Sequence, residues 1–589
     1  MSEQTYTVDV LVVGGGTGGA SAAIQAARSG AKTMLVSEFP WLGGMLTSAG
    51  VSAPDGNELE AFQTGLWGEF LQQLQQRQPE GLDNCWVSFF SYHPRVGAEI
   101  FANWVRQLPN LDWIWGQLPL EVRRQGNRVT AVRFANFTVY AKIILDGTEL
   151  GDLLALAEVS FRWGWELQSQ WQEPSAPVTF NSLTAKYPVQ APTWVVVMQE
   201  HGATKGMAPE IKAAPDYDPS LFAGAWDNYG AEAFLNYGRL PGGLFMINWP
   251  FNGNDYGQQL TRLIESKAAW REFQLECRYH SQNFARFIQT QCDRPLGLAH
   301  NVFPLCWEET GAFALHPYYR ESRRLVGLTT VTEWDILPMT SGRVAVLPED
   351  AIAIGNYVND HHYPGVKFEL QPKSLRWGGR QTGTPFAIPY RCLVPADTDG
   401  LLVCEKNISV SHIANGATRL QPVVMNIGQA AGMAAAICAQ LDCQPRDLPV
   451  KILQKALLQQ QRSPAAIVPL FNLPPDRPDW LYWQLYYLER PDTYPATGDC
   501  PGVLSFSHKT QLRHNLQCFS GILHVLAPQN YNFTILEPAL YKGQTWQLVT
   551  LRAHVNEQLQ NYLADKQSLK LWGRLNHAGN WLIAESLDA

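Results

Sequence analysis

The chain has 589 residues, of which 46% are hydrophobic and 17% charged, and its formal net charge is -8. A chain of this length exceeds a single hydrophobic core, so we expect two or three domains. The composition excludes a disordered or collagen-like chain, and the negative charge gives no reason to expect nucleic acid as a partner.

The sequence carries no motif for a metal site or a membrane anchor. The ten cysteines contain no CxxC pair, so their spacing indicates neither a zinc cage nor a redox dithiol. The first apolar run, residues 8–13, is too short for a signal peptide or a membrane-spanning helix. We therefore expect a soluble, cytoplasmic protein with no metal and no membrane span. The sequence does not decide whether it forms an oligomer.

The N-terminal segment has the pattern of a dinucleotide-binding unit. Residues 7–13 (TVDVLVV) are typical of a buried parallel strand, and GGGTGG follows at once. Residues 20–29 predict a helix, and a second strand over 32–37 ends at Glu38, whose carboxylate would accept hydrogen bonds from a ribose. A glycine-rich turn beside an incidental glutamate is the alternative. The expected contacts in the glycine motif are Gly14, Gly16, Thr17, Gly18 and Gly19.

Both NAD and FAD fit this unit, and the next segment favours FAD. The sequence WLGGMLTSAG covers residues 41–50 and brings a second glycine pair soon after Glu38. These glycines would let the backbone pass close to a ribityl chain or flavin, with Thr47 and Ser48 as hydroxyl donors, although a plain turn has the same composition. The expected contacts here are Gly43, Gly44, Met45 and Thr47.

Blocks along residues 5–440 resemble, in order, the FAD-dependent oxidoreductase family, which is distantly related to the succinate dehydrogenase and fumarate reductase flavoproteins. The blocks include GGGTGG, LGGMLTSAG, AKIILDGTELGDLLALA, YYRESRRLVG, AIGNYVNDHH and ATRLQPVVMNIGQAAG. The resemblance implies non-covalently bound FAD, oxidoreductase activity and a Rossmann-like α/β domain built from separated segments.

The resemblance also implies contacts for the two ends of FAD. Asp146 and Gly147 would return to the nucleotide site at the end of a strand, and the backbone near Val122 would lie beside the adenine. The family usually has Ala-Thr-Gly where this chain has residues 147–149, so Glu149 is a departure that puts close backbone approach there in doubt.

A later block implies contacts to the flavin ring. The helix predicted over 425–440 would point its N-terminus at the ring and stabilise the anionic reduced form. Its expected contacts are Gly428, Gln429 and Ala430. Glu405 would meet the ribityl hydroxyls, or else form a solvated strand end.

Three clusters supply candidate catalytic groups. Arg419 is similar to the arginine that holds a substrate carboxylate in fumarate reductases, and His412 precedes it by seven residues; bracing of the flavin loop is the alternative for Arg419. Asp360 and His362 match a DxH pattern that suits an acid/base pair, unless the histidine is structural. Arg320 belongs to the RESRR run, for which an ion-pair network between domains is the favoured interpretation and substrate contact the other.

The glycine motif occurs once in a strand-turn-helix context, so we expect no separate NAD(P)H domain. A small-molecule substrate would then exchange electrons with the flavin directly, with oxygen, a quinone or a carrier protein closing the cycle. The expected segments are an FAD-binding part (1–155), a cap domain of α+β type (156–345), a return to the FAD domain (346–445), a connector (446–500) and a small β-rich domain (501–589), a barrel or sandwich that could be OB-like.

These features lead to three functional hypotheses. The first is a dehydrogenase or oxidase that transfers hydride from a small organic substrate to FAD. The second is a flavin-dependent C=C reductase, which only the Arg419 resemblance supports. The third is an assembly protein in which FAD is structural and the C-terminal β region docks a partner.

Overall fold

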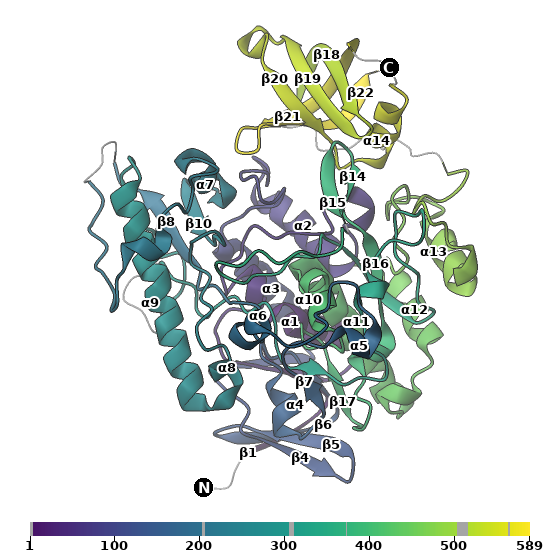
Figure 1. The fold of residues 1–589 in the computed structure, drawn as a ribbon. Coiled ribbons are helices and arrows are strands. Elements are labelled where there is room, and N and C mark those ends of the chain that lie inside the picture. Colours follow the sequence, from purple (N-terminus) through teal and green to yellow (C-terminus); the bar gives the residue numbers. More distant parts are fainter. Residues whose placement is uncertain are drawn as a thin grey trace.

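A mixed seven-stranded sheet forms the centre of the computed structural model, which describes residues 4–202, 207–305, 311–372, 374–503, 516–562 and 566–588. Its strand order is β3-β2-β1-β6-β5-β4, and β17 pairs in parallel with β6. Strands β1, β4, β5, β6 and β17 lie in the lower part of the molecule in Figure 1. The first three strands and β6 are parallel, whereas β4 and β5 form an antiparallel hairpin. The bounds are β1 Gln4–Val13, β2 Thr33–Ser37, β3 Leu111–Trp115, β4 Glu121–Gln125, β5 Arg128–Arg133, β6 Phe137–Asp146 and β17 Leu401–Val403.

Two buried helices, α1 (Thr17–Arg28) and α11 (Gln421–Leu441), pack against each other beside this sheet. Glycines make the close contact possible, because a Cβ at Gly428 would meet Gly18 O at 2.2 Å and one at Gly432 would meet Ala22 O at 2.1 Å. Within the described residues, α11 alone has the length and hydropathy to cross a membrane, but it is buried inside the fold. Helices α2 (Gly65–Arg77) and α3 (Pro94–Arg106) complete this layer.

A second hydrophobic core lies mainly in segment 156–345, called the cap segment below, whose small sheet has the order β11-β8-β10-β9. The long helix α9 (Lys267–Gln291) crosses it at the side of the molecule (Figure 1). Trp249 is buried at its centre, with Tyr229, Phe234 and Tyr237 around the indole. Several tryptophans of this segment are thus core residues, as aromatic burial favours. The strands are β8 Val196–Glu200, β9 Arg239–Leu240, β10 Leu244–Ile247 and β11 Leu296–Leu298, and the helices include α7 Ala231–Tyr237 and α8 Arg262–Glu265.

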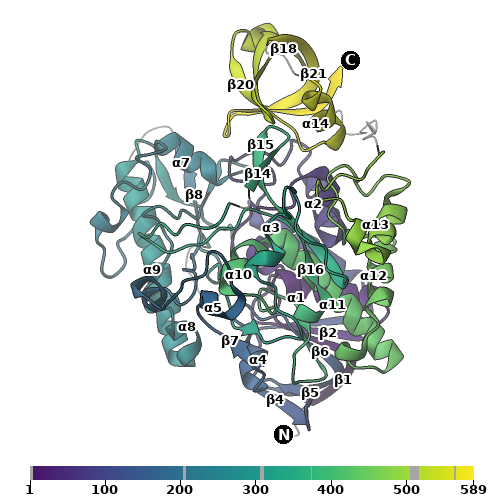
Figure 2. The ribbon, with the colours of Figure 1, turned by 45° about the vertical axis from the view of Figure 1, so that its right-hand side comes forward.

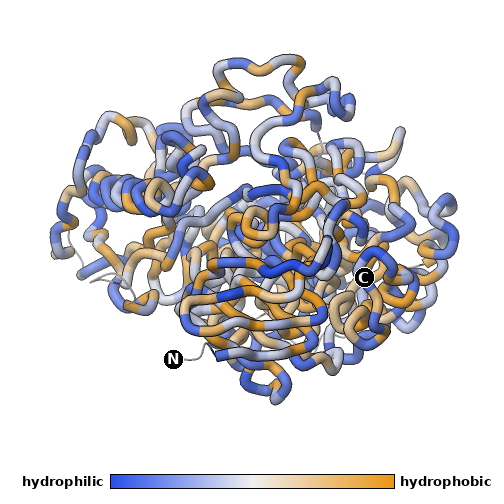
Figure 3. Tube along the Cα trace, turned by 90° about the horizontal axis from the view of Figure 1, so that it is seen from below, coloured by the Kyte–Doolittle hydropathy of each residue, from blue (hydrophilic) through white to orange (hydrophobic). Residues whose placement is uncertain are grey.

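Apolar stretches of neighbouring strands lie side by side in the main sheet when the molecule is seen from below (Figure 3). Several short strand pairs connect the two cores. They are β7 Phe161–Arg162 with β12 Arg324–Leu325, β13 Ala351–Asn356 with β16 Pro385–Pro389, and the hairpin β14 Ser374–Trp377 and β15 Arg380–Gly383. The remaining helices are α4 Asp152–Leu156, α5 Gln168–Trp171, α6 Ser182–Lys186, α10 His412–Thr418, α12 Val450–Leu458 and α13 Trp480–Glu489.

The C-terminal strands close into a five-stranded barrel of order β18-β19-β20-β22-β21. Strands β20 and β22 are parallel, the other pairs are antiparallel, and α14 lies between β20 and β21. This is the arrangement of an OB fold. The α/β class with a β-rich C-terminal appendage is therefore confirmed. The bounds are β18 Gln517–Ala527, β19 Asn530–Glu537, β20 Thr545–Val549, α14 Ala553–Gln560, β21 Gln567–Asn576 and β22 Trp581–Asp588.

The tip of the β14–β15 hairpin fastens this barrel to the rest of the molecule (Figure 2). Gly378 O accepts a hydrogen bond from Thr550 N at 2.8 Å, and Gly379 O accepts one from the Gln547 side chain at 2.8 Å. Nearby, Arg574 bonds both Asp83 and Glu585. The barrel surface around β20 is thus used for packing within the chain.

Replacing Gly379 by alanine is expected to loosen this docking. Its φ is +86°, and an added Cβ would meet Leu548 O at 2.1 Å, so we expect a loss of about 1–3 kcal/mol in unfolding free energy. Gly543→Ala is the matched control, because its φ is +82° with no atom within 4 Å. Thermal unfolding of both variants measures the difference. Equal midpoints would mean that the tip does not hold the barrel.

Candidate functional site

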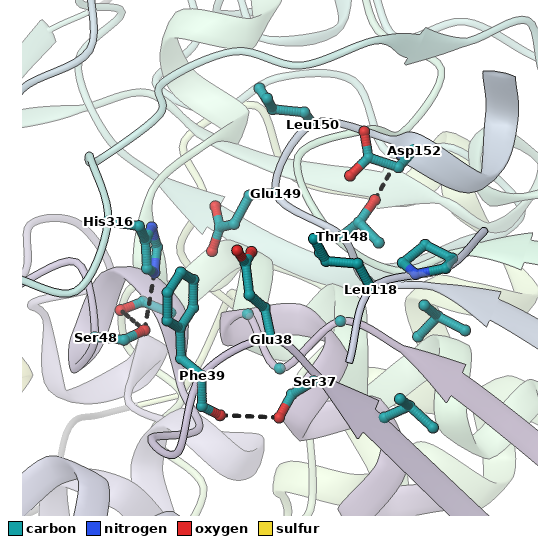
Figure 4. A pocket seen from close by; sticks show the side chains of 18 of the residues that line it. Ser37, Glu38, Phe39, Ser48, Leu118, Thr148, Glu149, Leu150, Asp152 and His316 are labelled. Atoms are coloured by element: carbon teal, nitrogen blue, oxygen red, sulfur yellow. Dashed lines mark hydrogen bonds between the residues drawn. The ribbon is translucent and has the colours of Figure 1, made fainter. Parts of the chain in front are cut away.

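A cavity of about 70 Å³ opens where β1, β2 and β6 end, at the carboxyl edge of the parallel strands. Ligands of open α/β sheets bind at this edge. A neighbouring cleft of about 590 Å³ shares Glu38 and Phe39 with it. Figure 4 shows Glu38, Glu149 and His316 side chains around the cavity. The described lining includes Gly14, Gly15, Gly16, Ser48, Leu118, Gly147, Thr148 and Asp152.

The glycine motif forms a cradle that side chains would fill. An added Cβ at Gly14 would meet Gly147 O at 2.2 Å, and one at Gly19 would meet Gly14 O at 2.2 Å. These two glycines therefore allow β1, α1 and the end of β6 to touch. Gly16 instead borders the cavity, where the atoms nearest to a Cβ would be side-chain atoms of Glu405 and Glu149.

Buried carboxyls surround the cavity, and burial alters their ionisation. It raises the pKa of Glu38, at the end of β2, to about 7. Burial likewise raises the pKa of Asp146 to about 7, against hydrogen bonds from Thr148. Within the described residues, Asp146 Oδ2 and Glu149 Oε1 are buried without a hydrogen-bond partner. The glycine cradle at a helix N-terminus fits the diphosphate of a dinucleotide, and carboxyl oxygens without a partner can accept hydrogen bonds from its hydroxyl groups.

The second glycine pair continues the cavity wall. Thr17 Oγ1 donates to Gly43 O at 2.7 Å, so the two glycine loops are tied together. The Thr47 hydroxyl donates a hydrogen bond to Leu42 O at 2.6 Å, and Met45 is buried in the second core. Ser48 instead faces the cavity and lies 2.9 Å from His316 Nε2.

A network of charged side chains lies beside the segment that precedes α11. His362 Nδ1 is 2.6 Å from Asp255 Oδ2, and its Nε2 is 2.8 Å from Asp360 Oδ2. Although burial opposes it, His362 and arginine charges hold the pKa of both carboxyls below the usual range. The imidazole of His362 thus bridges two carboxyl groups, one at each ring nitrogen. Arg419 continues the chain, at 2.6 Å from Tyr318 Oη and 3.3 Å from Asp360 Oδ2.

The RESRR run is buried and joins several segments. Arg320 donates to Ala191 O and Thr193 Oγ1 and lies 3.2 Å from Asp255. Arg324 bonds Glu166 at 2.7 Å and Val410 O at 2.8 Å. Removing one partner of such a buried pair leaves a charge without compensation. Arg320 thus forms an ion pair and hydrogen bonds inside segment 156–345, whereas Arg324 also reaches Val410 in the following segment.

A family model for FAD-dependent oxidoreductases matches residues 9–457. The chain belongs to the FAD-dependent oxidoreductase family. FAD is the cofactor of this family, and its diphosphate would lie at the glycine cradle beside the N-terminus of α1.

Comparison with solved structures gives only distant similarity to this oxidoreductase. A p-nitrophenol 4-monooxygenase from Pseudomonas putida DLL-E4 shares 12% identity over 34% of this chain and 48% of its own, with a TM-score of 0.22. The chain thus spans about half of that structure's length. A geranylgeranyl bacteriochlorophyll reductase-like protein from Thermoplasma acidophilum shares 11% identity over 84% of this chain and 89% of its own, with a TM-score of 0.32. No curated protein matches the chain.

Several residues that the sequence analysis assigned to FAD contacts pack against other parts of this oxidoreductase instead. Gln429 accepts from Leu66 N at 2.9 Å and donates to Ser463 O at 2.9 Å, so its side chain ties α11 to neighbouring segments. Gly428 packs on α1, and Ala430 is buried in the core. Val122 is half-buried on β4, whereas Gln117, Leu118 and Pro119 line the cavity where the adenine was expected.

The predicted catalytic residues fall into two neighbouring networks of polar side chains. His412 Nδ1 lies 2.9 Å from Glu321, and its Nε2 lies 2.6 Å from Tyr363 Oη, so both nitrogens are engaged. Of the predicted catalytic residues, Arg419, Asp360, His362 and Arg320 come together in one network, while His412 belongs to an adjoining one.

Sequence reasoning missed several residues that the fold brings to the site. Asp255 and Tyr318 are single polar residues in cap segments, and no spacing rule links them to residue 360 or 419. Asp55 lies in the loop after the second glycine pair, where Asn57 N donates to Asn356 O at 3.1 Å. Burial, with the charges of Glu58 and Asp360, raises the pKa of Asp55 well above its usual range.

Proposed function

We propose that this protein oxidises a small organic substrate that reaches bound FAD directly, as a dehydrogenase or an oxidase. Arg419 carries the proposal. It is buried immediately before α11, is held by Tyr318 and Asp360, and its Nε has no hydrogen-bond partner among the described residues. A buried guanidinium with an unused donor suits a carboxylate or another oxygen-rich group. The fumarate reductase stretch that resembles this segment uses its arginine in that way.

Asp55 is the group that we assign to proton transfer. Its loop touches the segment before α11, because a Cβ at Gly56 would lie 3.6 Å from the Tyr357 side chain and 3.7 Å from that of Leu420. Bound FAD supplies the hydride acceptor for the substrate carbon. Asp55 would take the proton that the substrate hydroxyl or amine loses, while Arg419 orients the substrate.

An anaerobic screen of metabolite pools tests the proposal. A substrate should bleach the flavin absorbance without oxygen, and oxygen, a quinone or a carrier protein should restore it. Since the glycine motif occurs once, NAD(P)H is expected to bleach it poorly. A protein that binds FAD but is never bleached by a donor or reoxidised by an acceptor would be the assembly protein of the alternative hypothesis.

Reduction of an activated C=C bond is a second candidate, favoured by the raised pKa of Asp55, since a neutral carboxyl can donate a proton. The pH dependence separates the two directions. As pH rises through the pKa of Asp55, the rate of substrate oxidation is expected to rise and that of C=C reduction to fall. Stopped-flow flavin absorbance measures both rates, and Asp55→Asn should flatten the profile. A wild-type profile in the variant would remove Asp55 from either mechanism.

A further inference from the structure

An acidic side chain already binds the end of α1 that a dinucleotide phosphate would use. Glu405 is fully buried just after β17, and its Oε2 accepts a hydrogen bond from Gly18 N at 2.7 Å. The first N–H groups of a helix are unpaired within the helix, and phosphates bind there for this reason. A cofactor diphosphate would therefore meet a resident carboxylate.

The charges around Glu405 do not balance. Lys406 Nζ lies 2.6 Å from Glu149 Oε2 and 3.1 Å from Glu405 Oε1, so one ammonium serves two carboxylates. A Cβ at Gly16 would lie 2.6 Å from Glu405 Oε2 and 3.1 Å from Glu149 Oε1. One at Gly44 would lie 2.6 Å from Glu149 Oε1. Both carboxylates thus border the backbone between the two glycine loops.

We propose that FAD binding to this protein is coupled to the uptake of one proton by Glu405. A diphosphate adds two negative charges to a buried site that already has an excess carboxylate, and like charges at such distances disfavour a second ionised group. A protonated carboxyl can also donate to a phosphate oxygen or a ribityl hydroxyl, which a carboxylate cannot do.

The ionisation of the neighbouring groups supports this choice of residue. Burial and the Glu149 charge raise the pKa of Glu405 to about 7, against Lys406 and the Gly18 hydrogen bond. Although burial acts against it, Lys406 and His316 hold the pKa of Glu149 below its usual range, so Glu149 stays ionised. Asp146 and Glu38 face the same cavity, each with a pKa of about 7, and are the other groups that could take up a proton.

The sign of the effect follows from linkage. FAD would raise the pKa of Glu405 above its value of about 7 in the free protein. The dissociation constant of FAD is then constant below this pH and increases by up to about tenfold per pH unit above it, until the pKa of the complex is reached.

Titration of the FAD-free protein with FAD, followed by tryptophan fluorescence between about pH 6 and 9, tests the proposal with no need for activity. Glu405→Gln is expected to bind FAD more tightly at alkaline pH and to lose the slope. Glu149→Gln should keep a slope but move its onset to lower pH, because the Glu149 charge that helps to raise the pKa of Glu405 is then gone. Asp146→Asn and Glu38→Gln should also keep it. A wild-type slope in Glu405→Gln, or a flat wild-type profile, would overturn the proposal.

Calorimetry on the wild type covers the case in which Glu405→Gln does not fold. Binding heats measured in buffers of different ionisation enthalpy report the number of protons exchanged. Near pH 8, we expect an uptake approaching one proton per FAD. An uptake of zero at this pH would contradict the coupling, whatever the variants show.

Discussion

Gly16→Ala is expected to weaken FAD binding by at least about 100-fold, which is about 2.7 kcal/mol, while the FAD-free protein keeps its fold. Gly16 has a φ of −60°, which alanine adopts without strain. The added methyl would point at Glu405 and Glu149, at 2.6 and 3.1 Å from their oxygens. It would therefore occupy the space beside the α1 N-terminus that the diphosphate needs.

Equilibrium titration with FAD and thermal unfolding of the FAD-free protein measure the two effects of Gly16→Ala separately. Gly126→Ala is the control, because it adds the same methyl at a hairpin tip with no atom within 4 Å. It should leave FAD affinity unchanged. Wild-type affinity in Gly16→Ala would place the diphosphate away from this helix terminus.

Arg419→Ala is expected to slow reduction of the flavin by substrate at least about 1,000-fold, with FAD affinity changed by less than about threefold. The guanidinium is fixed by Tyr318 and Asp360 and does not contact the glycine cradle. Its loss would leave the substrate without the cation that orients it, and would leave Asp360 with a less balanced charge.

Stopped-flow mixing with substrate under anaerobic conditions gives the reduction rate for Arg419→Ala. Arg419→Lys keeps the charge but loses the two-point geometry of the guanidinium, so an intermediate rate is expected. Tyr318→Phe removes one anchor of the arginine and should raise KM more than it lowers kcat. If Arg419→Ala reduced its flavin at the wild-type rate, Arg419 would only brace the loop before α11.

The nucleotide unit could be predicted because its signals are local. The run of residues 7–13, the glycine turn and the alanine-rich helix each follow from neighbours in the sequence, and the structure places them as β1 and α1. The C-terminal barrel could be predicted for the same reason, because short strands of alternating polarity and one helix indicate a small β-barrel. Both depend on periodicity and turn residues rather than on distant contacts.

The polar network could not be predicted in full, because it depends on distant pairings. His362 matched a short motif, but its second carboxylate, Asp255, comes from a cap loop 107 residues away. Gln429 shows the reverse case. Its position in a helix of small residues suggested the flavin, whereas its amide satisfies backbone groups of Leu66 and Ser463. Sequence patterns identify the elements, but packing decides which polar atoms remain available.

An experimental structure of the protein with FAD bound tests the central claim most directly. The account predicts the diphosphate beside Gly16 and the N-terminus of α1, the ribose at Glu38 and the flavin ring between Ser48 and Arg419. A flavin ring remote from Arg419, with the diphosphate in place, would contradict the proposed substrate site. A diphosphate bound away from α1 would contradict the account as a whole.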